Sequence, residues 1–159
     1  MSVKSGSQAV ISASGNPKDI IFEGAELNKR QQKLLQQLQN YGDRAIVRKS
    51  DVNLNDISAL TAYSGNEYAL FTNSGRRMVI RGDFRTVPVD INIAQNLSGQ
   101  GWRWSGHSHP GMTRTVLAPS RSDRIILQQF KNQTYSATVN SVGGYQRFSK
   151  DWSDWLPTY

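Results

Sequence analysis

The stretch GWRWSGHSHPGMTRTVLAPSRSD, residues 101–123, contains the features around which the rest of the chain can be interpreted. It holds both histidines of the chain, His107 and His109, in an H-x-H-P arrangement, and it ends in a Pro-Ser-x-x-Asp group at Asp123. Two imidazoles and one carboxylate can hold a zinc ion and leave one coordination position open for water, as catalytic zinc sites do. The chain has no cysteine, so disulfides and thiolate zinc sites are excluded.

Local patterns place these groups on a strand and at the start of a helix. Trp102 to His107 alternates large and small residues and predicts a strand, in which residues two apart point to the same face. An H-x-H sequence there aims both rings at one point. Ser120 and Asp123 form a Ser-x-x-acid capping box before an apolar run, which predicts a helix start. Each pattern alone also has an ordinary structural interpretation, as two polar histidines at a loop mouth and as a helix cap.

The rest of the chain alternates between helical and strand patterns. The predicted helices cover residues 27–41, 53–63, 93–97 and the segment that starts at Ser120, and the predicted strands cover residues 45–47, 68–71, 78–80, 86–91, 102–107, 134–139 and 145–148. Turn signals at residues 73–75 and 142–144 join four of these strands into two hairpins. Trp152, Trp155 and Leu156 predict a closing helical turn. We therefore predict an α/β or α+β fold, with a mixed sheet of about five or six strands packed against helices.

The length of 159 residues predicts one domain with a single core. The start of the chain is rich in Ser and Gly and has no sustained apolar period, so we expect residues 1–20 to form a flexible linker or arm. Residues 21–159 would then form the domain. No stretch has the apolar length of a membrane span, and the N-terminus lacks the hydrophobic region of a signal peptide.

The chain is basic, with 19 Lys and Arg against 12 Asp and Glu and a net charge of +7. Such a charge favours acidic partners, including nucleic acids and anionic surfaces. Arginines are spread along the chain and form no dense tract, unlike the clustered footprint of a nucleic-acid-binding protein. We therefore prefer an ordinary basic surface, and nucleic-acid binding stays open as an alternative.

The order strand, H-x-H-P-G, loop, S-x-x-D and helix resembles the JAMM (MPN+) metalloprotease family, whose signature is an upstream Glu followed by H-x-H-P and S-x-x-D. The resemblance covers Glu67 to about Phe148 and extends to a helix before the Glu strand and a hairpin after the S-x-x-D helix. The stretch W-S-G-H-S-H-P-G is also similar to JAMM-like domains at the C-termini of bacterial polymorphic toxins and some phage proteins. The resemblance implies a JAMM/MPN-like, cytidine-deaminase-like architecture.

Carried over residue by residue, the resemblance implies Zn²⁺ ligands at His107, His109 and Asp123, an oxyanion donor at Ser120, and a general base at the upstream Glu. Glu67 is the candidate base because it begins a strand forty positions before His107, a separation that looks normal for the family. The other two glutamates, Glu23 and Glu26, lie beside the first predicted helix, where acids are expected as partners of the helix dipole.

The resemblance therefore implies a zinc-dependent metallopeptidase or isopeptidase that hydrolyses a peptide or isopeptide bond through a zinc-activated water. It further implies a toxin or effector module, secreted or delivered into the cytoplasm of a target cell, with a protein or peptide substrate and a cognate immunity or inhibitor protein. Arg103, Arg114 and Arg121 near the motif raise the option of an acidic substrate tail, and a solvated loop explains them equally well. The alternatives are a basic toxin nuclease or nucleic-acid-binding module, and a catalytically inactive JAMM-like interaction domain.

Two features depart from the family pattern. His109 and Asp123 lie fourteen positions apart, which is longer than the family's usual loop. The strand that begins at Glu67 continues Tyr-Ala-Leu-Phe and lacks the Gly-rich continuation common in the family. The loop over residues 111–119 is therefore expected to decide whether the aspartate reaches the histidines.

Overall fold

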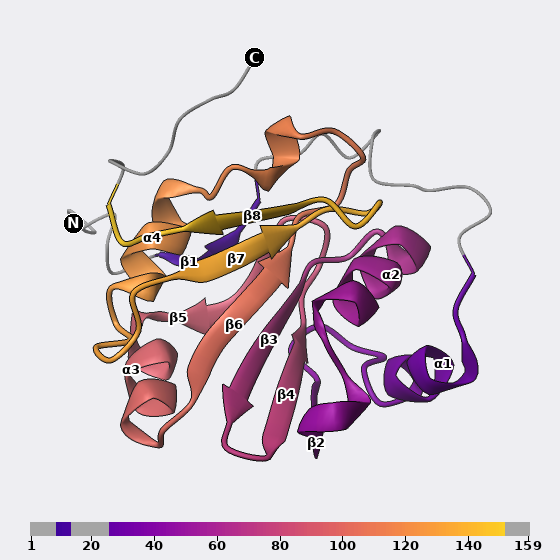
Figure 1. Ribbon diagram of the computed structural model, residues 1–159, viewed down its shortest axis with the longest axis horizontal. Helices are drawn as coiled ribbons and strands as arrows, with labels where there is room; N and C mark the ends of the chain where they lie inside the picture. The colour runs from indigo at the N-terminus through magenta and orange to yellow at the C-terminus, as the bar shows by residue number, and fades with distance from the viewer. Residues whose placement is uncertain (1–8, 14–25, 152–159) are drawn as a thin grey trace.

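The computed structural model of this chain describes residues 9–13 and 26–151, which form two β-sheets with helices packed against them (Figure 1). The larger sheet has the order β2-β4-β3-β6-β7-β8, and the smaller one pairs β1 with β5. The strands are β1 (Val10–Ser12), β2 (Arg44–Arg48), β3 (Tyr68–Asn73), β4 (Arg76–Arg81), β5 (Thr86–Asp90), β6 (Arg103–Ser108), β7 (Ser136–Val139) and β8 (Tyr145–Phe148). Among the described strands of this sheet, only β6 and β7 pair in parallel, so the predicted mixed sheet of five or six strands with helices is confirmed.

The described α-helices begin at side-chain caps that the sequence supplies. They are α1 (Lys29–Gln36), α2 (Leu54–Ser64), α3 (Ile91–Gly99) and α4 (Arg121–Leu127), with short 3-10 helices at Lys49–Asp51 and Thr115–Leu117. Asn28, Asn53 and Ser120 each close a capping box with the residue three positions later, which satisfies amides that the first helical turn leaves without a partner. No helix in these ranges is long and apolar enough to cross a membrane.

Helix α1 ends at Gln36, earlier than the predicted end at residue 41. The Arg81 guanidinium donates to the backbone carbonyls of Leu38, at 3.2 Å, and of Gln39, so a side chain takes over carbonyls that a longer helix would have used. Leu38 is fully buried beyond the helix end, among the residues packed around α2. The apolar pattern of the sequence therefore extends past the end of α1, because Leu38 packs into the same core although it is not helical.

Helices cover both faces of the larger sheet, α1 and α2 on one side and α3 and α4 on the other (Figure 1). Successive side chains of β3 point to opposite faces of the sheet and therefore pack into two different cores. Tyr68 and Leu70 pack with α1 and α2, whereas Ala69 and Phe71 pack with α3 and α4. A strand buried on both faces has a continuous apolar sequence, which explains why β3 lacks polar alternation.

Residues 9–13 differ from the expected N-terminal arm. Val10–Ser12 form β1, which pairs antiparallel with β5, and Ile11 is fully buried in the core that also contains Val87. The apolar run there is too short to stand out from its Ser- and Gly-rich surroundings, and its partner strand lies far along the chain. The remainder of the predicted arm, and the closing turn with Trp152, Trp155 and Leu156, lie outside the described residues.

Candidate metal centre

Strand β6 and the residue that follows it place both histidine side chains close together in the middle of the sheet. His107 lies in β6, between β3 and β7, and His109 follows the strand, with its N–H bonded to the Val139 carbonyl at 2.9 Å. A Cβ atom at Gly106 would lie 2.6 Å from a methyl carbon of Leu54 and 3.1 Å from the Ala137 carbonyl oxygen, so a larger residue there would require Leu54 to move. The two imidazoles meet edge to face, with ring centroids 4.5 Å apart.

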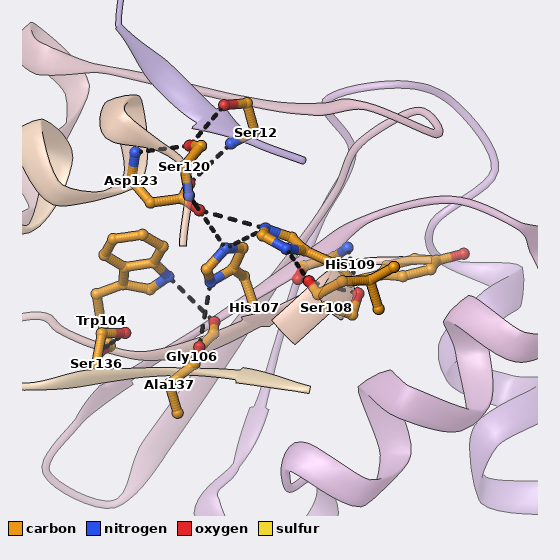
Figure 2. A network of polar contacts seen from close by, with 12 residues as sticks. Ser12, Trp104, Gly106, His107, Ser108, His109, Ser120, Asp123, Ser136 and Ala137 are labelled. Carbon is orange, nitrogen blue, oxygen red and sulfur yellow. Dashed lines mark hydrogen bonds and ion pairs between the residues drawn. The ribbon is translucent and has the colours of Figure 1, made fainter. Parts of the chain in front are cut away.

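The partners of the two rings determine which nitrogens carry protons. His107 Nδ1 lies 3.1 Å from the Ala137 carbonyl oxygen, and His109 Nδ1 lies 2.6 Å from that of Val116. A carbonyl oxygen only accepts hydrogen bonds, so each Nδ1 is a donor and each Nε2 of a neutral ring is a bare acceptor. The two Nε2 atoms nevertheless lie 2.8 Å apart (Figure 2). Two facing lone pairs at this distance repel each other unless a positive charge lies beside them.

Asp123 adds a third acceptor at the same point. Its Oδ2 lies 3.0 Å from His107 Nε2 and 3.2 Å from His109 Nε2. The side chain is fully buried, yet the charges and hydrogen bonds of the two histidines outweigh the effect of burial and hold the pKa of Asp123 well below its usual range. The carboxylate is therefore ionised. The loop that precedes it does not keep Asp123 from the histidines, because a 3-10 turn at Thr115–Leu117 folds back and gives the Val116 carbonyl to His109.

The surroundings of His107 favour its neutral form. The ring is fully buried against Trp104, with centroids 4.9 Å apart, and against Phe148 at 5.8 Å. Burial, together with the nearby His109, lowers the pKa of His107, although the Asp123 carboxylate opposes this effect. The Nε2 atoms of the two rings and the Asp123 carboxylate therefore converge at one point. Their mutual distances are close to the separation of about 3.3 Å between ligand atoms around a tetrahedral zinc ion.

Glu67 lies beside the histidines, and its carboxyl group has no hydrogen-bond partner among the described residues. It is fully buried, and both carboxyl oxygens are without a partner there. Glu67, His107 and His109 form a buried group whose potential ligand atoms all lie within 4.8 Å of one another, which could hold a metal ion. Burial, and next the negative charges of Asp123 and Asp83, raise the pKa of Glu67 well above its ordinary value. A buried carboxyl group without a partner destabilises a fold, and such groups are typical of functional sites.

The backbone of Glu67 is held by the turn that follows β4. The Glu67 N–H donates to the Asp83 carbonyl at 2.6 Å, and the Gly82 N–H donates to the Glu67 carbonyl at 2.7 Å. A Cβ atom at Gly82 would lie 1.9 Å from the Thr86 carbonyl oxygen, so this turn requires glycine. The carboxyl group is thus positioned by backbone contacts, and its side chain is left free for another partner.

Ser120 and Ser12 lie on the opposite side of the Asp123 carboxylate from the histidines (Figure 2). Ser120 Oγ accepts the Asp123 N–H at 3.0 Å, and the Ser120 N–H donates to Asp123 Oδ2 at 2.9 Å. Ser120 Oγ also lies 2.9 Å from Ser12 Oγ. The structure therefore brings Ser120 to Asp123 as a helix cap. Ser12 has no motif around it, and the sequence interpretation missed it.

The raised pKa of Glu67 predicts how the stability of the metal-free protein depends on pH. The folded state keeps a proton that the unfolded chain releases above the ordinary glutamate pKa, so stability falls as the pH rises from that value toward neutrality. We expect metal-free Glu67→Gln protein to be more stable than the unchanged protein at pH 7, by about 1–3 kcal/mol. The difference should shrink toward about pH 4. Urea unfolding in chelator over this pH range measures it, and equal stability at pH 7 would contradict the expectation.

The chain was compared with protein-family models, with curated proteins and with solved structures. None of them matches it. The resemblance to JAMM metalloproteases therefore rests on the H-x-H-P and S-x-x-D residues of the sequence. What stands independently of any family is a buried cluster of two histidines and a glutamate, with Asp123 against both rings, that could hold a metal ion.

Proposed function

We propose that this chain is a zinc-dependent, JAMM-type hydrolase that cleaves a peptide or isopeptide bond. One observation carries the proposal. The Nε2 atoms of His107 and His109 and Oδ2 of Asp123 converge within 3.2 Å of one another as three acceptors, beside the buried Glu67 carboxyl group that has no partner among the described residues. This combination supplies ligands for a cation and a separate group for proton transfer.

The donor set favours zinc over other ions. Two imidazoles and one carboxylate suit a borderline-soft cation, whereas magnesium and calcium prefer sites built from oxygen ligands. Each histidine also bonds a backbone carbonyl through its other nitrogen, at Ala137 and Val116, as zinc-binding histidines commonly do. Three protein ligands around a tetrahedral ion leave one position for water, so the residues present fit a catalytic site.

In this proposal each side chain has a separate role in the reaction. When bound, zinc supplies a Lewis acid that lowers the pKa of water and polarises a substrate carbonyl. Glu67 accepts the proton of the attacking water and passes it to the leaving nitrogen, a role that suits a buried carboxyl group whose pKa is raised above its ordinary value. Ser120 Oγ is proposed to stabilise the developing oxyanion when Ser12 is the donor between the two hydroxyls, because the Ser120 proton is then free.

Removal of the metal is expected to lower the thermal stability of the protein. Zinc that binds only the folded state at about 1,000 times its dissociation constant contributes about 4 kcal/mol, which corresponds to about 10 °C in unfolding temperature for a chain of this length. We expect one zinc per chain by elemental analysis and a matching fall in the melting temperature after chelation. Re-addition of zinc should restore it. A protein that binds no zinc and does not respond to chelator would contradict the proposed metal centre.

The cleavage reaction can be tested without knowing the natural substrate. The zinc-loaded protein is incubated with a peptide library and with isopeptide-linked protein conjugates, and new amide-derived termini are detected by mass spectrometry. We expect products that disappear with chelator. Degradation of RNA or DNA without peptide cleavage would favour the nuclease alternative, and zinc binding without any turnover would favour an interaction module. A role as part of a larger toxin, with an immunity protein as inhibitor, belongs to the same proposal.

A further inference from the structure

We infer that the N-terminal strand β1 is part of the metal centre, because the backbone N–H of Ser12 positions the Asp123 carboxylate for metal binding. This inference rests on the proposed metal centre. Ser12 is a positioning residue here, since it acts on the metal through Asp123. The consequence is that the affinity of the site for zinc depends on a segment more than a hundred positions away in sequence.

The two oxygens of the Asp123 carboxylate have separate partners. The Ser12 N–H donates to Oδ1 at 2.9 Å, whereas Oδ2 accepts the Ser120 N–H and faces both histidines. A carboxylate on a two-bond side chain can rotate about its last bond, and a rotation would exchange the two oxygens. Backbone donors on both oxygens prevent this, so Oδ2 keeps its place at the histidines (Figure 2).

The geometry of β1 explains why the Ser12 N–H is available. Alternate residues of an antiparallel strand direct their N–H groups to opposite sides. The Ala13 N–H donates to the carbonyl of Arg85, the residue just before β5, at 2.7 Å, so the Ser12 N–H points away from β5 and toward α4. The Ser12 amide is therefore not required for pairing between the strands and, among the described residues, donates to the Asp123 carboxylate.

Hydrophobic packing holds β1 in this position. Ala9, Ile11 and Ala13 alternate with Val10 and Ser12 and are 1, 0 and 6% exposed. Ile11 lies in the same core as Ile126 of α4, the helix that carries Asp123. Ser12 Oγ makes a second link to α4 through Ser120 Oγ. The strand and the start of the helix are thus fixed to each other by core contacts and by two polar contacts.

Replacement of Ser12 by Pro tests the inference, because it removes the N–H that Asp123 uses and leaves the Ala13 N–H in place. Partners of metal ligands typically change affinity 10- to 100-fold, so we expect Ser12→Pro to weaken zinc binding by about that factor. Ser12→Ala is the matched control, since it keeps the N–H and removes only the hydroxyl. It should bind zinc several-fold more tightly than Ser12→Pro. Titration against a chromophoric chelator measures both affinities.

Two further readouts separate positioning from simple loss of structure. The absorption spectrum of the Co²⁺-loaded protein reports coordination geometry, and it should change in Ser12→Pro and stay unchanged in Ser12→Ala. Amide hydrogen exchange in the unchanged protein should show protection at Ser12 that Asp123→Ala removes, whereas the amide of Ala13 stays protected as an internal control. The exchange measurement does not depend on whether the proline variant folds.

The outcomes distinguish this inference from the function on which it rests. If the unchanged protein binds no zinc, the proposed metal centre fails. If it binds zinc and Ser12→Pro binds it equally well, or if the Ser12 amide of the unchanged protein exchanges as fast as an unbonded amide, the inference fails while the metal centre stands. A Ser12→Pro protein that loses stability in chelator but keeps its zinc affinity also contradicts the positioning role.

Discussion

Asp123→Ala protein is expected to lose stoichiometric zinc binding, with an affinity reduced by more than about 100-fold. The reduction should exceed the one caused by removing a residue that only hydrogen-bonds a metal ligand. The variant loses the oxygen that lies 3.0 Å from His107 and 3.2 Å from His109, and it leaves two bare Nε2 atoms facing each other. It also loses the N3 half of the capping box that Ser120 begins, which should lower the stability of the fold. Elemental analysis and a zinc titration measure the first effect, and unfolding in chelator measures the second.

Thr138→Val is the matched control for this variant. Thr138 pairs with His107 across β6 and β7, is fully buried, and its hydroxyl has no hydrogen-bond partner among the described residues. Removal of that hydroxyl should therefore leave zinc binding unchanged and the stability equal or higher. Stoichiometric zinc in Asp123→Ala, or loss of zinc in Thr138→Val, would show that the ion does not bind where the three acceptors converge.

Glu67→Gln is expected to keep its zinc and to lose turnover by about 10²- to 10⁴-fold, the usual contribution of a general base. The amide preserves the shape of the side chain but cannot accept the proton of the attacking water. The measurement compares zinc content and cleavage rate for the same preparation. Glu26→Gln is the control, because Glu26 is the other glutamate in the described part of the chain and is exposed. It should retain full activity.

Glu67→Gln also distinguishes two roles for this carboxyl group. Glu67 belongs to the buried group that could hold a metal ion with His107 and His109, so it could be a ligand instead of a base. Loss of zinc from Glu67→Gln would make it a ligand. Retention of zinc together with full turnover would remove Glu67 from the reaction and leave the proton transfer to another group.

Local sequence patterns predicted most of the elements. The hairpin turn at residues 73–75, the helix that starts near residue 53 and the strand that ends near His107 all lie where expected, because each depends on neighbours within a few positions. The same applies to the capping box of Ser120 and Asp123. Local patterns failed at the end of α1, where Arg81 takes the carbonyls that follow the helix, and at β1, where the partner strand is distant.

The sequence by itself determined the chemistry that is available: two histidines aimed by one strand, an aspartate at a helix start, and no cysteine. Only the tertiary structure decided that Asp123 reaches the histidines, that Glu67 is buried without a partner of its own among the described residues, and that Ser12 holds the carboxylate. The physical reason is distance along the chain. Periodicity and caps act between near neighbours, whereas these contacts join segments that meet only when their apolar side chains pack into a common core.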